Sequence, residues 1–477
     1  MKSIAIIGGG FAGTATAIHL LRASLGERLQ LYVVEQRTRL GRGLAYSIWD
    51  DNYVLNVPAG NMSLYADEPD HFVHFCQQTD PAYGPASFIS RRLFGDYIEQ
   101  ELQQAAKNSR SYFEPVFAEA TAVRPQRQGG MQIEFANRPP LQVDSVVLAT
   151  GHLDSTPPVP ALSALPPHTY INDPWQVGAF DGFSAAEPVA IIGTGHTAVD
   201  VLFTLTGRYD ARRVLMLSRH GLLSHPHRVQ TRLKAPKGFP EFLDRCNPSV
   251  LSYARAIREQ VRRGEELGVD WRDIIGRLRP YTAEIWQRLP VAERRRFLRR
   301  LVAYWDIHRH RLAPTAHHRL CAMIQRGNVE VTSARITDCR PCDDGVQLLL
   351  KAPQDQNRTV VVKRVINCTG PNYDLSRSAR PLFRQLLGEG HVRADPLRIG
   401  LDMAADYGVI GRDGRPATAI SYIGPMLKAR YWEAIAVPEL RVHAQLLANR
   451  LAAECRTPAA EPGLEAVTSE PSYQIAS

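Results

Sequence analysis

Two glycine-rich segments constrain the fold of this chain more than any other feature. Each follows a short apolar run, residues 4–7 in the first case and 189–192 in the second, and each opens a stretch with helical spacing. The spaced small residues are Gly8, Gly10 and Gly13 in the first segment and Gly193, Gly195 and Ala198 in the second. A strand, a glycine turn and a helix in this order predict the dinucleotide-binding fingerprint of a Rossmann-like unit.

The fingerprint has a physical basis. Its first small residue permits the tight turn, the second lets a pyrophosphate approach the backbone, and the third lets the helix pack on the strand. The helix that follows offers unpaired N–H groups and the positive end of its dipole to the phosphates. Two such units predict two bound dinucleotides. Because the common pairing is FAD with NAD(P)H, the pattern indicates redox chemistry.

The two units differ at the end of their second strand. In the first unit the apolar run 31–34 ends at Glu35, whose carboxylate can hold a ribose diol. In the second unit Ser218 and Arg219 follow the run 214–217 and could accept a 2′-phosphate, which a carboxylate would repel. This favours NADPH slightly, although a solvated loop arginine is the alternative and NADH stays open.

Size and composition narrow the class of protein. The 477 residues suffice for two or three domains, and 44% hydrophobic with 22% charged residues is typical of a soluble globular protein. No apolar run reaches the roughly 18 residues of a membrane-spanning helix. The chain enters its first expected strand at once, without the apolar region of a signal peptide, so we expect a cytoplasmic protein with no membrane partner.

The seven cysteines are odd in number and scattered, so they predict no disulfide framework. Cys339 and Cys342 have the spacing of a redox pair, but they lie in an expected strand before an Asp-Gly turn and a second strand. Reactive pairs of this spacing normally lie at a helix start, where the dipole lowers the thiol pKa. A redox role for this pair is therefore not favoured.

Most of the net charge of +9 comes from one segment. Residues 251–320 contain 16 arginines and no lysine against 8 acidic residues. Nucleic-acid binding would explain this excess, but a solvated, arginine-rich helix surface is the commoner explanation. A cationic funnel for a small anionic substrate is a third possibility. The sequence does not indicate an oligomeric state.

A second internal repeat indicates how the domains are connected. Two apolar strands end in Thr-Gly, at Thr150-Gly151 and at Thr369-Gly370, and they bracket the second fingerprint. By analogy with two-dinucleotide flavoproteins, we expect an α/β fold with two Rossmann-like domains, the nicotinamide domain being inserted in the FAD domain. The expected segments are 1–175 and 366–455 for the FAD domain, 185–235 and 320–365 for the NAD(P) domain, 236–319 for a helical insertion, and 456–477 for a disordered tail.

Two nucleotide sites fit three reaction classes. A disulfide reductase would carry a cysteine pair after the second strand, but residues 36–75 contain no cysteine. Two reaction classes remain: transfer of electrons to an external carrier, and oxygenation of a substrate by a monooxygenase.

A resemblance to a known family favours the monooxygenase. The segments that carry it are GRGLAY (41–46), LNVPA (55–59), Met62-Ser63, DHF (70–72), WDIHRHR (305–311) and WEAIAVPELR (432–441). In order and spacing they resemble the flavin/NAD(P)-binding family that contains bacterial FAD-dependent urate hydroxylases and aspartate N-monooxygenases. The resemblance spans about 440 residues.

The resemblance implies a single-component enzyme that uses FAD, NAD(P)H and O2 through a flavin C4a-hydroperoxide. Urate hydroxylation to 5-hydroxyisourate, a step of purine breakdown, is the first substrate choice, because the compact chain resembles that branch in length. N-hydroxylation of an amino acid of the aspartate type is the alternative. A flavin reductase and a nucleic-acid-associated flavoprotein are further rivals. An anionic purine and an acidic amino acid both call for arginine and histidine donors.

Candidate residues for substrate and flavin follow, each with an ordinary structural alternative. The resemblance places Asn56 near the flavin ring, where the alternative is a plain turn. Arg92 could reach flavin phosphate or lie on a helix surface, and Gly424 stands where related flavoproteins contact the ribityl chain. His225 could orient nicotinamide or substrate. The densest cationic cluster contains His308, Arg309 and Arg311, for which we weigh substrate binding against an internal ion-pair network. No metal site is expected, because no carboxylate or thiolate is spaced to complete the His-x-His pair.

Overall fold

The computed structural model describes residues 1–23, 28–47, 53–184, 187–207, 213–228, 238–353 and 357–456. Its larger sheet has six strands in the order β16-β17-β7-β1-β2-β3, all paired in parallel except β16 with β17. The strands are β1 (Ser3–Ile7), β2 (Gln30–Glu35), β3 (Tyr112–Phe117), β7 (Ser145–Leu148), β16 (Gly408–Ile410) and β17 (Pro416–Tyr422). Apolar runs such as β1 are buried because helices cover the sheet, as parallel strands require.

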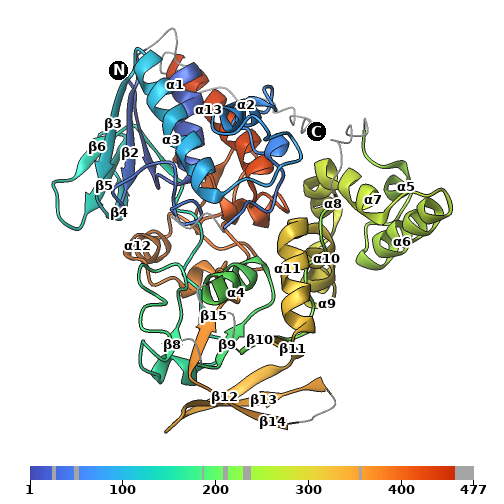
Figure 1. Ribbon diagram of the computed structural model, residues 1–477. Helices are drawn as coiled ribbons and strands as arrows, with labels where there is room; N and C mark the ends of the chain where they lie inside the picture. The colour runs from blue at the N-terminus through green and yellow to red at the C-terminus, as the bar shows by residue number, and fades with distance from the viewer. Residues whose placement is uncertain are drawn as a thin grey trace.

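Three long helices pack beside this first sheet: α1 (Phe11–Ala23), α3 (Arg91–Asn108) and α13 (Val437–Arg456) (Figure 1). A small antiparallel sheet of β4 (Ala120–Pro125), β5 (Met131–Phe135) and β6 (Leu141–Val143) contacts α12 (Pro381–Glu389). The shorter elements of this part are α2 (His71–Gln77), η1 (Ala59–Asn61), η5 (Leu375–Arg377) and η6 (Pro425–Ala429).

The second sheet has five parallel strands in the order β11-β10-β9-β15-β8. They are β8 (Tyr170–Ile171), β9 (Val189–Ile192), β10 (Val214–Ser218), β11 (Val329–Ser333) and β15 (Arg364–Asn367), with η2 (Pro160–Ala164) before them. Alternate side chains of β9 enter different cores. Val189 and Ile191 are in the hydrophobic core that the second sheet forms with α4 (His196–Gly207) and α11 (Pro314–Gln325). Ala190 and Ile192 are in the hydrophobic core that the second sheet forms with a small antiparallel sheet. That sheet contains β12 (Arg335–Cys342), β13 (Gly345–Lys351) and β14 (Asn357–Val362).

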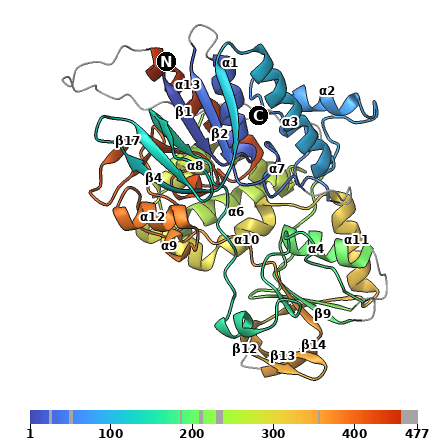
Figure 2. The same ribbon diagram turned by 90° about the vertical axis from the view of Figure 1, so that its left-hand side faces the viewer.

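A helical block lies beside both sheets (Figures 1 and 2). Its elements are α5 (Glu241–Asp244), α6 (Val250–Glu266), α7 (Trp271–Arg277), η3 (Arg279–Tyr281), α8 (Thr282–Arg288), α9 (Val291–Arg300) and α10 (Val302–Arg309). Side-chain caps fix two helix starts, because the Ser249 hydroxyl accepts from Ser252 N and the Asp270 carboxylate accepts from Arg272 N. Within the described residues, no helix is both long and apolar enough to cross a membrane.

The α/β class, the two Rossmann-like units and the helical insertion agree with expectation, but three expected edges are wrong. β8 pairs with β15, so residues 170–171 belong to the second sheet although 1–175 was assigned to the first domain. The edge between 365 and 366 falls inside β15, which pairs with β9 along its whole length. The edge between 319 and 320 falls inside α11, whose Leu320 and Met323 are in the core of the second sheet. The expected tail begins at Arg456, the last residue of α13, and residues 457–477 lie outside the described residues.

Candidate functional site

The first glycine loop joins β1 to α1 and leaves its outer side open. A Cβ on Gly8 would lie 2.1 Å from the carbonyl oxygen of Ala149, and a Cβ on Gly13 would lie 1.9 Å from that of Gly8. At Gly10 the nearest atom to such a Cβ is 3.4 Å away, on Gly43. Packing therefore requires glycine at positions 8 and 13. The bare backbone at Gly10, at the start of α1, could receive a pyrophosphate.

Glu35 lies at the carboxyl end of β2 with its carboxylate held beside this loop. One oxygen accepts a hydrogen bond from Gly9 N at 2.8 Å and the other accepts from Arg37 N at 3.0 Å. Each carboxylate oxygen has further lone pairs, so the group can still accept from a ribose diol. A hollow of 570 Å³ lies next to Glu35 in the chain and is lined by Gln36 and Arg37, by Phe117 at the end of β3, and by residues that follow β3. These residues fit the adenosine part of a dinucleotide.

The second glycine loop, between β9 and α4, has the same construction. Gly193 has φ +126°, and a Cβ there would lie 2.3 Å from the carbonyl oxygen of Cys368. Nothing lies within 4 Å of a Cβ on Gly195, and Ala198 is fully buried against the sheet. The open side of this loop at the start of α4 could therefore receive a second pyrophosphate.

Ser218 and Arg219 lie at the carboxyl end of β10, next to this second loop. The Ser218 hydroxyl accepts from Gly221 N at 2.9 Å and lies 3.1 Å from the Thr194 hydroxyl. The Arg219 side chain is exposed and forms no ion pair within the described part of the chain. An unpaired guanidinium at this place could bind a 2′-phosphate.

The two Thr-Gly ends lie side by side where the chain passes between the two sheets. Leu153 and Asn372 form an antiparallel bridge, and the Ser155 hydroxyl donates to the Gly370 carbonyl at 3.0 Å. Arg380 donates to the carbonyl of Thr150 at 3.1 Å and to that of His152 at 2.8 Å. Gly151 and Gly370 both have positive φ, +68° and +90°, which permits the chain to turn after each strand. The two Thr-Gly ends thus mark the two places where the chain passes between the first and the second sheet, which we call the double crossing.

Gly424 lies near this crossing, at the carboxyl edge of the first sheet. Its φ is +137°, and a Cβ there would lie 2.8 Å from the Tyr422 hydroxyl. That hydroxyl accepts from Met426 N at 3.1 Å, which fixes the start of η6. Arg92, the other expected flavin contact from this part, lies in the first turn of α3. Its carbonyl lies 3.5 Å from Arg42, a buried cation that pairs with Glu99.

Of the predicted substrate cluster, His225, His308 and Arg311 come together. The rings of His225 and His308 are 4.7 Å apart, and both contact Trp271. The guanidinium of Arg311 lies 6.0 Å from the Trp271 ring, and its buried Nε lacks a hydrogen-bond partner in the described residues. Burial, reinforced by nearby arginines, lowers the Arg311 pKa to about 10. Asn56 is connected to this region by its carbonyl, which lies 3.0 Å from His227 Nε2.

Arg309 is an exception, and the expectation that it binds substrate is wrong. Its guanidinium is buried and donates to the Glu433 carboxylate at 2.8 Å. Trp305 donates to the same carboxylate at 2.8 Å, and Arg279 pairs with Glu439 at 2.5 Å. Helical spacing turns Arg309 toward α13 while its neighbours face elsewhere, so it belongs to the internal ion-pair network that was the alternative.

Several arginines on the surface of the helical block pair with acidic residues of their own helices. Arg262 contacts Glu259 at 2.9 Å and Glu266 at 3.0 Å, and Arg288 contacts Glu284 at 2.7 Å. Such pairs at spacings of three and four residues are typical of a solvated helix surface. They favour this explanation of the basic segment over nucleic-acid binding.

A further cluster, missed from the sequence, lies where the crossing, η6 and α10 meet. Lys428 Nζ lies 4.8 Å from the Tyr373 ring centre, and the His152 and Tyr373 rings are 5.8 Å apart, edge to face. Desolvation raises the pKa of Asp306 on α10 to about 6, opposed by Lys428. Burial lowers the pKa of His152 to about 4. The only sequence signal for this cluster is that His152 and Tyr373 follow the Thr-Gly ends closely.

The comparisons with known proteins agree with this construction. Residues 5–153 match a family described as FAD-NAD(P)-binding, and these residues contain the first glycine loop and the first Thr-Gly end. This part of the chain is therefore an FAD/NAD(P)-binding domain. The expectation of an FAD/NAD(P)-binding protein and the expected cofactors, FAD and NAD(P)H, are confirmed. No curated protein sequence matches the chain.

Solved structures resemble this flavoprotein over nearly its whole length. Ornithine hydroxylase from Pseudomonas aeruginosa, in its reduced form, has a TM-score of 0.63 at 15% identity and covers 96% of this chain and 100% of its own. L-lysine 6-monooxygenase from Pseudomonas syringae has a TM-score of 0.63 at 17% identity, with coverages of 95% and 99%. Ornithine N-hydroxylase from Kutzneria sp. 744 has a TM-score of 0.62 at 12% identity, with coverages of 96% and 100%. At these identities the likeness establishes the two-domain flavoprotein fold.

Proposed function

We propose that this flavoprotein is an N-hydroxylating monooxygenase that acts on the amine of a small substrate. The observation that carries the proposal is the end-to-end likeness to ornithine and lysine hydroxylases, including the helical block as well as both nucleotide-binding domains. Chain length was the reason to prefer urate hydroxylation. Because this chain and the ornithine hydroxylase cover each other almost completely, its length fits the N-hydroxylating alternative equally well, and urate loses that support.

The reaction consumes an amine, O2, NAD(P)H and a proton and gives a hydroxylamine, water and NAD(P)+. FAD, when bound, would carry the electrons from nicotinamide to oxygen and deliver one oxygen atom to the substrate. In this proposal Gly10 and Glu35 hold the FAD pyrophosphate and ribose. Gly195 and the N-terminus of α4 hold the nicotinamide dinucleotide, and Arg219 binds the 2′-phosphate of NADPH.

The substrate amine must lose its proton before its lone pair can attack oxygen. Asp306 is our candidate for the group that accepts this proton, because its pKa of about 6 leaves a carboxylate near neutral pH that still has proton affinity. Lys428 lies in the same cluster, and desolvation lowers its pKa, opposed by Asp306. Tyr373 and His152 complete the lining of this corner, next to the crossing where the two sheets meet.

The test is a substrate panel with the purified, FAD-loaded protein under 18O2. Ornithine, lysine, aspartate, cadaverine and urate are each supplied with NADPH or NADH, and product mass is followed beside oxygen uptake. We expect one amine to give a hydroxylamine that contains one 18O atom, with NAD(P)H consumed in step. Hydroxylated urate, or hydrogen peroxide as the only product with every amine, would overturn the proposal.

A further inference from the structure

A cavity of 490 Å³ lies inside the helical block, away from both glycine loops. Its walls come from α6 to α10 and from Trp432, which follows η6. We call it the aromatic pocket, defined by Tyr253, Trp271, Trp286, Phe297, Trp305 and Trp432. Its volume is in the range of cavities that bind small organic molecules. Among the candidate contacts named above, His225 and His308 line it, whereas the residues of the two glycine loops, Glu35 and Arg219 do not.

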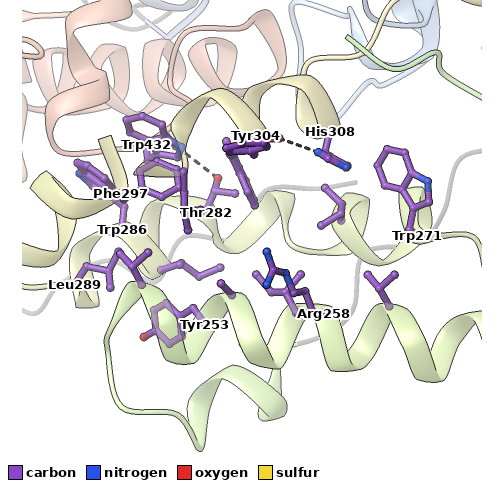
Figure 3. A pocket seen from close by; sticks show the side chains of 18 of the residues that line it. Tyr253, Arg258, Trp271, Thr282, Trp286, Leu289, Phe297, Tyr304, His308 and Trp432 are labelled. Atoms are coloured by element: carbon purple, nitrogen blue, oxygen red, sulfur yellow. Dashed lines mark hydrogen bonds between the residues drawn. The ribbon is translucent and has the colours of Figure 1, made fainter. Parts of the chain in front are cut away.

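One end of the aromatic pocket is apolar and well packed. Trp286 and Trp432 stack with ring centres 4.6 Å apart, and Phe297 meets Trp432 edge to face at 5.3 Å. Figure 3 shows these three rings together at one end, with Leu289 beside them. The Trp286 indole N–H donates to the Ala429 carbonyl at 2.9 Å, so its polar atom is satisfied within the protein. This end therefore offers apolar and aromatic surface to a ligand.

The other end of the aromatic pocket carries one arginine and two histidines. Arg258 projects from α6 toward the cavity, with His308 and Trp271 beyond it (Figure 3). Arg258 has no hydrogen bond or ion pair within the described residues, whereas Arg262, one turn further along α6, is paired with Glu259 and Glu266. His308 Nδ1 lies 2.8 Å from the Tyr304 carbonyl, to which it can donate.

Negative charge at this end is limited. Glu265 is the acidic residue among the residues that line the pocket, on the same helix as Arg258 and two turns away. His225 lies with His308 at this end. Arg272, whose guanidinium lies 4.4 Å from the Trp271 ring, does not line the pocket and is paired with Asp270 at 3.3 Å. An apolar half and, at the other end, the guanidinium of Arg258, which has no partner within the described residues, call for a ligand with an apolar body and an anionic head.

We propose that the aromatic pocket binds an amphipathic carboxylate, with its aromatic or medium-chain aliphatic body against Trp286 and Phe297 and its carboxylate at Arg258. This site goes beyond the proposed N-hydroxylation, because it needs neither oxygen nor a nicotinamide. Its test and the substrate panel above can therefore fail independently.

The test measures binding to the FAD-loaded protein by isothermal titration calorimetry, with decanoate and decylammonium as a pair that differs in head charge. We expect saturable binding of one decanoate per chain and weaker binding of decylammonium. Ala254→Trp places a large ring in the wall of the pocket on α6 and should abolish decanoate binding. Arg258→Gln should weaken decanoate by about fivefold and reduce its preference over decylammonium, since Arg258 is largely exposed. Arg255→Gln is the matched control, because Arg255 is an exposed arginine of the same helix outside the pocket.

Flavin absorbance and thermal unfolding, measured for each variant, show whether the fold is intact. If Ala254→Trp does not fold, the two arginine variants test whether decanoate binds in the pocket at Arg258. Decanoate binding that is unchanged in a folded Ala254→Trp protein overturns the location of the site. Equal affinity for decanoate and decylammonium overturns the proposal that the pocket selects an anionic head. Equal losses of decanoate affinity in Arg258→Gln and Arg255→Gln overturn the proposal that the carboxylate binds at Arg258. An absence of saturable binding overturns the proposal as a whole.

Discussion

Replacement of Arg309 by methionine should destabilise the protein without acting on substrate contacts. The Arg309 side chain is 10% exposed and the Glu433 side chain 3% exposed, so the substitution leaves a buried carboxylate without its closest cation. Breaking a buried pair from one side costs about 3–5 kcal/mol, because the remaining charge is not compensated. Arg279 and the Trp305 indole remain near Glu433 and should keep the cost toward the lower end of that range.

The effect should depend on pH in a definite direction. Burial raises the Glu433 pKa above 4.5, and Arg309 opposes this shift. Without Arg309 the native pKa rises further, so the folded protein binds a proton more readily than the unfolded chain between pH 4.5 and that raised value. Stability is therefore lost as pH rises through this window. The variant should differ most from the wild type above the window and less as pH falls.

Urea unfolding followed by tryptophan and flavin fluorescence, at several pH values, provides the measurement. The double variant with Glu433→Gln should recover part of the loss, because the amide removes the buried charge and its oxygen can still accept from Trp305. Lys351→Met, a substitution of an exposed cation on β13, is the control. If Arg309→Met has the stability of the wild type and a raised KM for the amine substrate, the structural role of Arg309 is refuted. Such a result would indicate that Arg309 binds substrate.

Three further results are expected. Arg219→Gln should raise KM for NADPH by about tenfold and leave KM for NADH nearly unchanged, because only the 2′-phosphate loses a charge-assisted hydrogen bond; steady-state kinetics with both coenzymes check this. Gly13→Ala should abolish FAD retention, since its Cβ would lie 1.9 Å from the Gly8 carbonyl oxygen, whereas Gly276→Ala, with nothing within 4 Å, should retain FAD and gain up to about 1 kcal/mol of helix stability in urea unfolding. Asp306→Asn should remove the acidic limb near pH 6 from the profile of kcat/KM, while FAD binding stays unchanged; a limb that persists in the variant belongs to another group.

The nucleotide-binding construction could be predicted because its constraints are local. Gly8 and Gly193 follow apolar strands directly and precede helices, and the close approach of Gly13 to the Gly8 carbonyl lies within one strand–turn–helix unit. The contacts of Gly8 with Ala149 and of Gly193 with Cys368 instead join each unit to the end of a neighbouring strand. The double crossing was also predictable, since Thr150-Gly151 and Thr369-Gly370 repeat one pattern at the ends of two strands. A pattern that is repeated along the chain predicts a structural repeat when each copy forms the same element.

The rest depends on contacts between distant segments. Residues 170–171 form a strand only because β15 pairs with them, and two residues carry no periodicity of their own. Arg309 and Arg311 are indistinguishable in a run of alternating histidine and arginine, and only the placement of Glu433 on a distant segment separates them. The cluster of Lys428, Tyr373 and His152 unites three segments. His152 and Tyr373 closely follow the repeated Thr-Gly ends, but nothing in the sequence connects Lys428 to them.

The proposed reaction depends on two dinucleotides held so that electrons pass from one to the other. The most direct measurement is anaerobic mixing of the FAD-loaded protein with NADPH while the flavin absorbance is followed. We predict one FAD per chain, loss of the oxidised-flavin absorbance on mixing, and its return when air is admitted. Purified protein that cannot be loaded with FAD, or a bound flavin that neither NADPH nor NADH reduces, would contradict the account.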